Sequence, residues 1–131
     1  MSRHGKCDQE DGLWTELHDN GQKKKEGRFK DGKKDGLWIE WYDDGQKSRE
    51  TNYCDGESNG QGTTWYDNGQ KSREIHYKAG RPDGPWTTWW RDGKKKRVGR
   101  FAGGKKAGIW IWYHEDGTKR HRVTYENSIE G

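Results

Sequence analysis

The stretch DGLWIEWYDDGQKSRETNYCDGES, residues 35–58, decides the fold of this chain, because variants of it recur along the sequence. DGLWTELHDNGQKKKEGRFKDGKK at 11–34 has the same pattern, and three further copies start at Asn59, Asp83 and Ala107. A unit of about 24 residues cannot bury an apolar face alone, so each copy must pack on its neighbours. We predict one repeat domain of five units, 11–34, 35–58, 59–82, 83–106 and 107–131, after a partial repeat or cap at 1–10.

The composition of the chain, taken as an average, is that of a disordered protein. Charged residues make up 37% of the sequence and hydrophobic residues only 25%, a balance at which chains usually fail to bury a core. The aromatic residues argue for folding, because the nine Trp, six Tyr and two Phe recur at fixed repeat positions. Each such ring can bury roughly 150–250 Å². We therefore expect a folded protein whose core consists of aromatic rings.

Each copy contains two turn signals separated by short aromatic or charged runs, which predicts pairs of β-strands. The first signal is an Asn-Gly or Asp-Gly dipeptide, which suits a two-residue hairpin loop. The second signal, such as Asp31-Gly32 with Gly36 four residues later, predicts a longer return between hairpins. Helical periodicity is absent. The predicted fold is all-β, an elongated antiparallel sheet of five successive hairpins. The first signals are Asn20-Gly21, Asp44-Gly45, Asn68-Gly69, Asp92-Gly93 and Asp116-Gly117.

A two-residue loop fixes which residues face one another across each hairpin. It places Trp14 opposite Gly27, and in the third copy, where Gly62 replaces the Trp, it places Ile75 opposite Gly62. Volume lost on one strand then returns on the other, as close packing favours. A three-residue loop with a Gly bulge is the alternative, and it would turn every side chain to the other face. Trp14 is expected to share its face with His18, Lys23, Lys25, Gly27 and Phe29.

The opposite face is predicted to carry rings at Trp41, Trp65, Trp89 and Tyr113, next to Trp90 and Trp112. Two interpretations stay open for these rings. Either the long stems of Lys and Arg cover them, or they form a contact surface for a partner.

Basic residues recur as strictly as the aromatic ones. We expect two parallel rows along one side of the sheet, which could hold an acidic protein face, an anionic lipid head group or a nucleic-acid backbone. The alternative is a solvated lattice compensated by repeating acids such as Glu26, Glu50 and Glu74. Compensation weakens in residues 86–122, because Arg91, Val98 and Arg122 replace acids there. One row is Lys23, Lys47, Lys71, Lys95 and Lys119, and the other is Lys25, Arg49, Arg73, Arg97 and His121.

Residues that could perform catalysis or bind a metal are few. His114-Glu115-Asp116 occupies the repeat position of His18-Asp19-Asn20, which explains the cluster without catalysis. The histidines show no paired spacing suited to a metal, and no helix follows Gly60-Gln61-Gly62 to complete a phosphate site. We predict no enzyme activity, no cofactor and no metal.

The cysteines and the charge bear on the environment of the protein. Cys7 and Cys54 lie about two repeats apart, roughly 19 Å at the spacing of strands, beyond the ~7 Å limit for a disulfide, so we expect free thiols. No apolar run resembles a signal peptide or a membrane span, and a cytoplasmic location is expected. The net charge of +4, with both signs finely interleaved, favours solubility over nucleic-acid binding.

The motif W-x-x-[WY]-[YW]-x-[DN]-G-[QK]-K-x-x-x-x-x-[YF]-x-x-G resembles the MORN repeat (membrane occupation and recognition nexus), in the variant common in bacterial proteins, over residues 11–126. Eukaryotic repeats read more like YxGxWxxGxxxGxG, so phospholipid binding attributed to them transfers poorly. The bacterial variant is similar to antitoxin or immunity components of toxin–antitoxin modules. The resemblance implies an elongated antiparallel sheet of successive hairpins and identifies architecture better than function.

Three hypotheses for function follow. The first is a non-enzymatic protein-interaction module, of antitoxin or immunity type, that binds a partner toxin through an aromatic and basic sheet face. The alternative is peripheral binding to an anionic lipid or membrane surface, and the third is ligand recognition in aromatic cages, as in choline-binding repeats. Self-association through the sheet edges is a further expectation. The predicted partner-binding residues are Trp41, Trp65, Trp89, Trp90, Trp112, Tyr113, Lys95, Arg97, Lys119 and Arg120.

Overall fold

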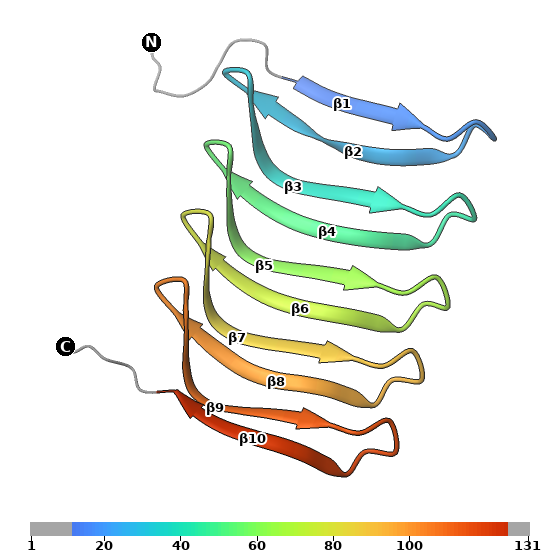
Figure 1. The fold of residues 1–131 in the computed structure, drawn as a ribbon. Coiled ribbons are helices and arrows are strands. Elements are labelled where there is room, and N and C mark those ends of the chain that lie inside the picture. The colour runs from blue at the N-terminus through green and yellow to red at the C-terminus, as the bar shows by residue number, and fades with distance from the viewer. Residues whose placement is uncertain (1–11, 126–131) are drawn as a thin grey trace.

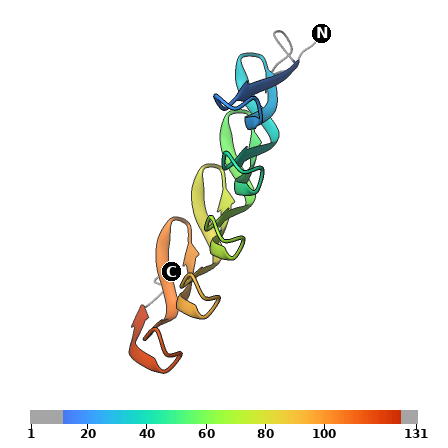
Figure 2. The ribbon, with the colours of Figure 1, turned by 90° about the vertical axis from the view of Figure 1, so that its right-hand side faces the viewer.

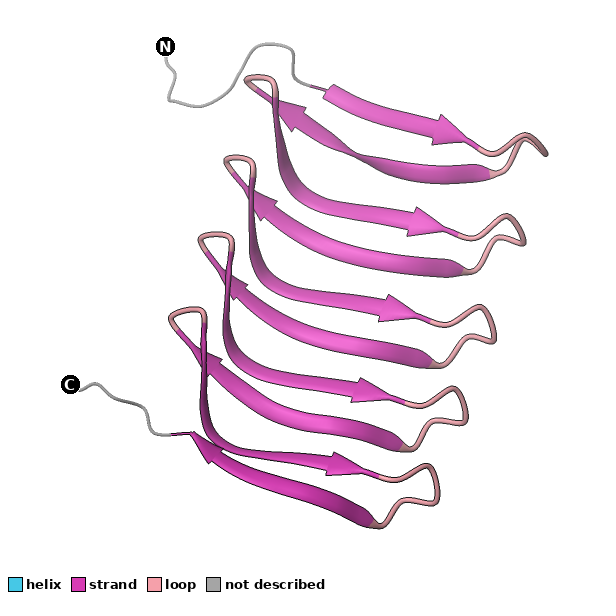
Figure 3. Ribbon diagram, viewed as in Figure 1, coloured by secondary structure: helices cyan, strands magenta, loops and turns pink. Residues whose placement is uncertain are grey.

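A computed structural model describes residues 12–125 and shows one open antiparallel sheet of ten strands, ordered along the sheet as in the chain (Figures 1 and 3). The predicted all-β fold is confirmed, and no helix occurs within these residues. The predicted cap at 1–10 lies outside the described part of the chain. The strands are β1 (Gly12–Leu17), β2 (Lys23–Lys30), β3 (Lys33–Trp41), β4 (Lys47–Cys54), β5 (Glu57–Trp65), β6 (Lys71–Lys78), β7 (Arg81–Trp89), β8 (Lys95–Ala102), β9 (Lys105–Tyr113) and β10 (Lys119–Tyr125).

The repeats form a stack in which two strands belong to each copy. Every strand pairs with its neighbours in the chain, and the turned view in Figure 2 shows the copies following one another along a single axis. Such an arrangement is quasi-one-dimensional, because each unit is stabilised by the unit before and the unit after it.

The two kinds of turn have the opposite roles to those predicted from the sequence. The tight two-residue loops are the second signals: Asp31 and Gly32 both have positive φ, 61° and 77°, and they separate the paired residues Lys30 and Lys33. Positive φ at both central positions is the requirement of a type I′ turn, whose twist suits a hairpin. The predicted longer returns between hairpins are therefore tight turns.

The first turn signals form three-residue loops. In the first copy the His18 backbone N donates to the Gln22 carbonyl at 2.8 Å and the Gly21 N donates to the His18 carbonyl at 2.9 Å, so the prediction of a two-residue loop was wrong. The register was nevertheless right, because Trp14 lies opposite Gly27. The reason is a β-bulge: Leu17 pairs with Lys23 but Glu16 pairs with Lys25, and the extra residue Lys24 cancels the extra loop residue.

A second set of glycines bends the strands. Gly36, with a φ of 84°, and its counterparts Gly60, Gly84 and Gly108 lie inside β3, β5, β7 and β9 and not in loops as predicted. Figure 1 shows each of these strands curving sharply near its start. A left-handed backbone at that point is accessible to glycine without strain, which explains the invariant spacing within the chain.

The core consists of rings packed between neighbouring repeats. Trp110 is fully buried and Trp38 is 4% exposed. Each ring lies over a glycine of the preceding repeat, so close that a Cβ on Gly27 would stand 2.0 Å from the Trp38 ring and one on Gly99 would stand 2.1 Å from the Trp110 ring. Complementary volumes are therefore matched between repeats as well as within each hairpin.

Hydrogen bonds join successive repeats along the two sides of the stack where the turns lie. At the three-residue loops, the Tyr42 and Tyr66 hydroxyls donate to the carbonyls of Trp65 and Trp89, each at 2.6 Å. At the type I′ turns, backbone N–H groups such as that of Gly56 donate to the preceding repeat at 2.9 Å. The turns on both sides of each repeat are thereby fixed relative to the next repeat. Side chains at equivalent positions therefore form regular rows on the two faces of the sheet.

Candidate functional site

The bulge at the start of each even strand sends the two basic rows to opposite faces of the sheet. Lys23 pairs with Leu17, whereas Lys25 pairs with Glu16, and successive side chains of a strand point to opposite faces. The prediction of two rows along one side was wrong, and so was the expected face of Lys23. We call the face that carries Trp14, Trp38, Gly62, Trp86 and Trp110 the ring face. The lysine face is the one that carries Lys23, Lys47, Lys71, Lys95 and Lys119.

The residues predicted to bind a partner do not form one surface. Trp112 lies on the ring face, 6.2 Å from Trp110 between ring centroids, and it pairs with Arg97; the prediction had placed it on the opposite face. Trp90 follows the end of β7, and Arg120 stands at the bulge of β10. The lysine face holds Trp41, Trp65, Trp89, Tyr113, Lys95 and Lys119.

The lysine face is electrically compensated in its first three repeats. Lys23 Nζ lies 2.8 Å from Glu26 Oε1, Lys47 Nζ lies 2.7 Å from Glu50 Oε2, and Lys71 pairs with Glu74 in the same way. The hydrogen bond from Lys23 is the main cause that lowers the pKa of Glu26.

Aromatic rings on the lysine face lie under these ammonium groups. Lys23 Nζ stands 5.7 Å from the ring centroid of Trp41, and Lys47 Nζ stands 5.8 Å from that of Trp65. Both rings are half-buried. The interpretation in which basic stems cover the rings therefore describes these two positions.

Compensation stops in the last two repeats. Val98 and Arg122 occupy the positions of the paired glutamates, and within residues 12–125 neither Lys95 nor Lys119 has a carboxylate partner. Ile109, on the same face, is 46% exposed. This end of the lysine face thus combines unpaired positive charge with exposed apolar surface.

Arg91 was expected to weaken the compensation, and the structure shows otherwise. Its Nη2 lies 2.6 Å from Asp67 Oδ1 of the preceding repeat, and its guanidinium lies 5.3 Å from the Tyr66 ring centroid. The hydrogen bond with Asp67 raises the pKa of Arg91. Arg91 therefore connects two loops and adds no free charge.

The ring face contains two aromatic clusters, one at each end of the stack. In the first, Trp38 contacts Phe29 and Trp14 with centroids 5.1 and 5.8 Å apart. Lys34 Nζ lies between Trp38 and Tyr53, 4.8 and 5.0 Å from their centroids. Burial, followed by repulsion from Lys25, lowers the pKa of Lys34.

The second cluster surrounds the fully buried Trp110. Trp86 and Phe101 lie 5.1 and 5.2 Å from it, and Tyr125 lies 6.2 Å away. Lys106 Nζ stands 5.2 Å from the Trp110 centroid and covers it from outside. Large rings buried in this way stabilise the stack, which is a structural role.

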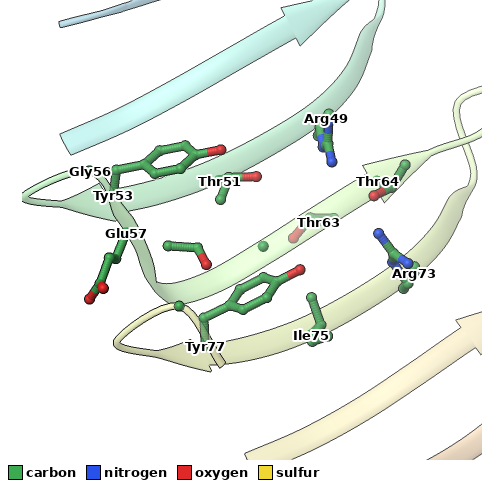
Figure 4. A pocket seen from close by; sticks show the side chains of 13 residues that line it. Arg49, Thr51, Tyr53, Gly56, Glu57, Thr63, Thr64, Arg73, Ile75 and Tyr77 are labelled. Atoms are coloured by element: carbon green, nitrogen blue, oxygen red, sulfur yellow. The ribbon is translucent and has the colours of Figure 1, made fainter. Parts of the chain in front are cut away.

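Between the two clusters the ring face is hollowed (Figure 4). Gly62 stands where four other copies have Trp, and the space of about 340 Å³ beside it is lined by residues of β4, β5 and β6 that include Tyr53, Tyr77 and Ile75. Arg49 and Arg73 lie at the other end of the hollow and point toward one another across β5 (Figure 4). The prediction that Ile75 replaces the missing volume holds only in part. The substitution of Gly62 at the Trp position was the signal in the sequence that could have located this hollow.

The titratable clusters singled out from the sequence have structural partners. His18 Nε2 donates to the Trp41 carbonyl at 2.8 Å, and hydrogen bonds from Thr118 lower the pKa of Asp116. Cys54 is an exposed free cysteine, and Cys7 lies outside the described residues. Among residues 12–125, no three or more His, Cys, Asp or Glu side chains gather as metal ligands would. A helix able to span a membrane is likewise not found there.

Comparison with known proteins agrees with the repeat architecture. The family described as MORN repeat variant matches residues 10–31, 34–55, 58–79 and 106–127. The copy at 83–106 lies outside these matches, although its strands β7 and β8 pair like the others. No curated protein matches the chain. The matches cover more than half of the sequence, and the chain therefore belongs to the MORN repeat variant family.

Proposed function

We propose that this protein is a non-enzymatic interaction module that binds an acidic protein surface on the lysine face of its last two repeats. MORN repeats are typical of modules that interact with proteins or membranes. The observation that carries the proposal is the contrast along one face: Lys23 and Lys47 are paired with glutamates, whereas Lys95 and Lys119 are not. If the lysines were only part of a solvated charge lattice, glutamates should pair with them in every repeat. A surface that binds an acidic partner instead needs lysines that no glutamate of its own chain neutralises.

The geometry at this end suits a protein partner. Trp89 and Tyr113 lie beside Lys95 and Lys119 as their cross-strand partners, and exposed Ile109 adds aliphatic surface. Aromatic rings with adjacent charge dominate the energetic centres of protein interfaces. The strands hold the backbone of these groups at fixed spacing, so little backbone conformational entropy is lost on binding.

The decisive variant restores the acids that the earlier repeats already have. In Val98→Glu/Arg122→Glu, each new carboxylate stands three residues after a lysine, as Glu26 does after Lys23. We expect capture of the partner from the native host to fall at least tenfold, with the loss concentrated in the association rate at low salt. Unchanged capture would contradict the proposal.

A matched control makes the opposite change at the other end of the stack. Glu26→Val removes the acid of the first repeat and gives it the composition of the fourth. Since this repeat lies outside the proposed site, capture should stay within about twofold of the wild type. Circular dichroism on both variants shows whether the sheet is intact.

A finer version of the proposal makes the partner a toxin and this protein its antitoxin or immunity component. The support is the resemblance of the repeat motif, and the test is co-expression of candidate toxins with the wild type and with Val98→Glu/Arg122→Glu. Protection by the wild type alone supports this version. We also expect Trp89→Ala to weaken partner binding more than Lys119→Ala.

Anionic membrane binding is the second candidate function, favoured by the row of five lysines on one face. Vesicles containing anionic lipid should then sediment the protein at low salt, and neutral vesicles should not. The charge-restoring variant separates the two functions, because a membrane would use the whole row and lose only part of its affinity. Equal sedimentation with both kinds of vesicle excludes this candidate.

A further inference from the structure

We propose that the hollow beside Gly62 on the ring face is a binding site for a small aromatic carboxylate. This site lies on the opposite face from the proposed protein-binding surface and uses different residues. Its volume of about 340 Å³ falls at the small end of the range of ligand pockets, roughly 300–1,000 Å³.

The hollow is the place of a missing indole. The same repeat position holds Trp14, Trp38, Trp86 and Trp110 in the other copies, and all four rings lie on the ring face. The backbone at Gly62 does not have a positive φ, and a Cβ there would stand 3.1 Å from Tyr77 and 3.6 Å from Ile75. The position therefore accepts a side chain with a small shift of Tyr77, and glycine leaves the space open.

The walls of the hollow match those that hold the indoles elsewhere. Trp38 is held edge-on by Phe29, with centroids 5.1 Å apart and planes at 78°, and Trp110 is held by Phe101 at 5.2 Å and 86°. Tyr53 occupies the equivalent position beside the hollow, and Tyr77 forms its second wall. Both tyrosine rings direct their hydroxyl ends into the space (Figure 4). A planar ring would thus find edge-to-face contacts already in position.

Arg73 repeats the contact that covers an indole in the next copy. In the fourth repeat, the Arg97 guanidinium lies 4.8 Å from the centroid of Trp86, and Arg73 is the corresponding residue of the third repeat. Because Gly62 has no ring, the third repeat offers Arg73 no indole at the position that Trp86 occupies for Arg97. A ligand ring in the hollow would restore this cation–π contact.

The charge at the hollow selects an acid. The cross-strand neighbours of Arg73 are Thr64 on β5 and Thr88 on β7, and neither carries a charge. Arg49 has an acidic neighbour, Glu40, and 3.5 Å separate Arg49 Nη1 from Glu40 Oε2. Within the described part of the chain, no carboxylate pairs with Arg73. Glu57, an acidic residue of the lining, points its carboxylate away from both arginines (Figure 4). Two facing guanidinium groups favour a carboxylate on the ligand.

The test uses the full chain, indole-3-acetate as the acidic probe and indole as the neutral one. Titration followed by ¹H–¹⁵N correlation spectra should give saturable shifts for Tyr53, Ile75 and Tyr77, with indole-3-acetate at least tenfold tighter than indole. Shifts that do not saturate at millimolar probe overturn the site. Equal affinity for the two probes overturns the assignment of a carboxylate ligand.

Two variants fill the hollow, one changes its charge, and a fourth is the control. Gly62→Trp should abolish binding of both probes, and Gly62→Leu gives a smaller filling if the indole disturbs the sheet; binding that persists in a folded filled variant overturns the proposal. Arg73→Gln should weaken indole-3-acetate about tenfold, or about 1.4 kcal/mol, and weaken indole by a smaller factor, because indole loses only the cation–π contact. The control Arg28→Gln, an exposed arginine of the lysine face, should change neither affinity.

Discussion

Two glycines, Gly27 and Gly99, determine how closely neighbouring repeats approach. Neither has a positive φ, so their role is to leave room for a ring and not to provide a special backbone conformation. The Trp38 and Trp110 rings occupy the space where a Cβ would be. Because protein interiors are close-packed, a methyl group at either position must displace an indole.

Gly27→Ala and Gly99→Ala should each destabilise the fold by about 1–3 kcal/mol, the usual cost of overpacking. Chemical denaturation followed by Trp fluorescence measures the effect. Gly62→Ala is the matched control, since its Cβ would meet Tyr77 at 3.1 Å and no indole at all, and its effect should be smaller. Equal losses in all three variants would contradict the ring-over-glycine account.

The pair of Lys23 and Glu26 gives the stability a defined pH dependence. The pKa of Glu26 is lowered from 4.5, chiefly by its hydrogen bond with Lys23, so the unfolded chain binds more protons than the folded one as the pH falls. The contribution of the pair is complete above pH 4.5 and is lost as the pH falls through the folded-state value. Glu26→Gln should therefore lose less stability than the wild type between pH 6 and pH 3, by denaturant titration. Lys23→Gln should behave in the same way. If the free energy of unfolding of both variants falls with pH as steeply as that of the wild type, the Lys23–Glu26 pair does not cause the pH dependence.

At the scale of the strand and its turns, one position departs from its counterparts. Ala79 begins a type I′ turn with a φ of 51°, where Asp31, Asp55 and Gly103 stand in the other copies. A left-handed conformation costs an alanine roughly 1–2 kcal/mol, while Asn and Asp tolerate it better.

Ala79→Asn should stabilise the protein by about 0.5–1 kcal/mol, because the turn keeps its geometry and loses its strain. The measurement is the midpoint of urea unfolding. Ala79→Val is the contrasting variant and should be destabilising, since a β-branched residue is the poorest choice for positive φ. A stabilised Val variant would show that the turn changes its type.

The turns also show how far the sequence predicts these elements. Asn20-Gly21 and Asp31-Gly32 are both good signals for a two-residue loop, yet only the second forms one. The dipeptide alone does not distinguish them, because the bulge at Lys24 that accompanies the longer loop carries no sequence signature of its own. Strand order could be predicted. The pairing of Trp14 with Gly27 could be predicted too, because the one extra residue in the loop is offset by the one extra residue in the bulge.

The same bulge limits what the sequence says about the candidate site. The positions of Lys23 and Lys25 two residues apart imply one face on a regular strand, and the bulge between them places them on two. The residues predicted to form one surface therefore lie on two, the lysine face and the ring face. The loss of compensation at Val98 and Arg122 was visible in the sequence, because it depends on residue identity and not on register.

At the scale of the whole molecule, the stack is held by two ring clusters with a gap between them. The rings of Trp14, Phe29 and Trp38 form one cluster, and those around Trp110 form the other. At the third repeat, Gly62 and Thr51 face each other across β4 and β5 with no ring pair between them. In a one-dimensional stack, stability is the sum of such neighbouring contacts, so we expect this interface to be weaker than those that the two ring clusters fill.

Native-state hydrogen exchange should therefore find β5 opening before β3 and β9. The amides of Thr63 and Thr64 are paired in the sheet like those of Ile39 and Ile111, so a difference in protection reports the packing and not the backbone bonds. Gly62→Trp should raise the protection of β5 toward that of β3, since an indole at this position joins the two clusters. If β5 is as protected as β9 in the wild type, the backbone ladder and not the rings holds the stack together.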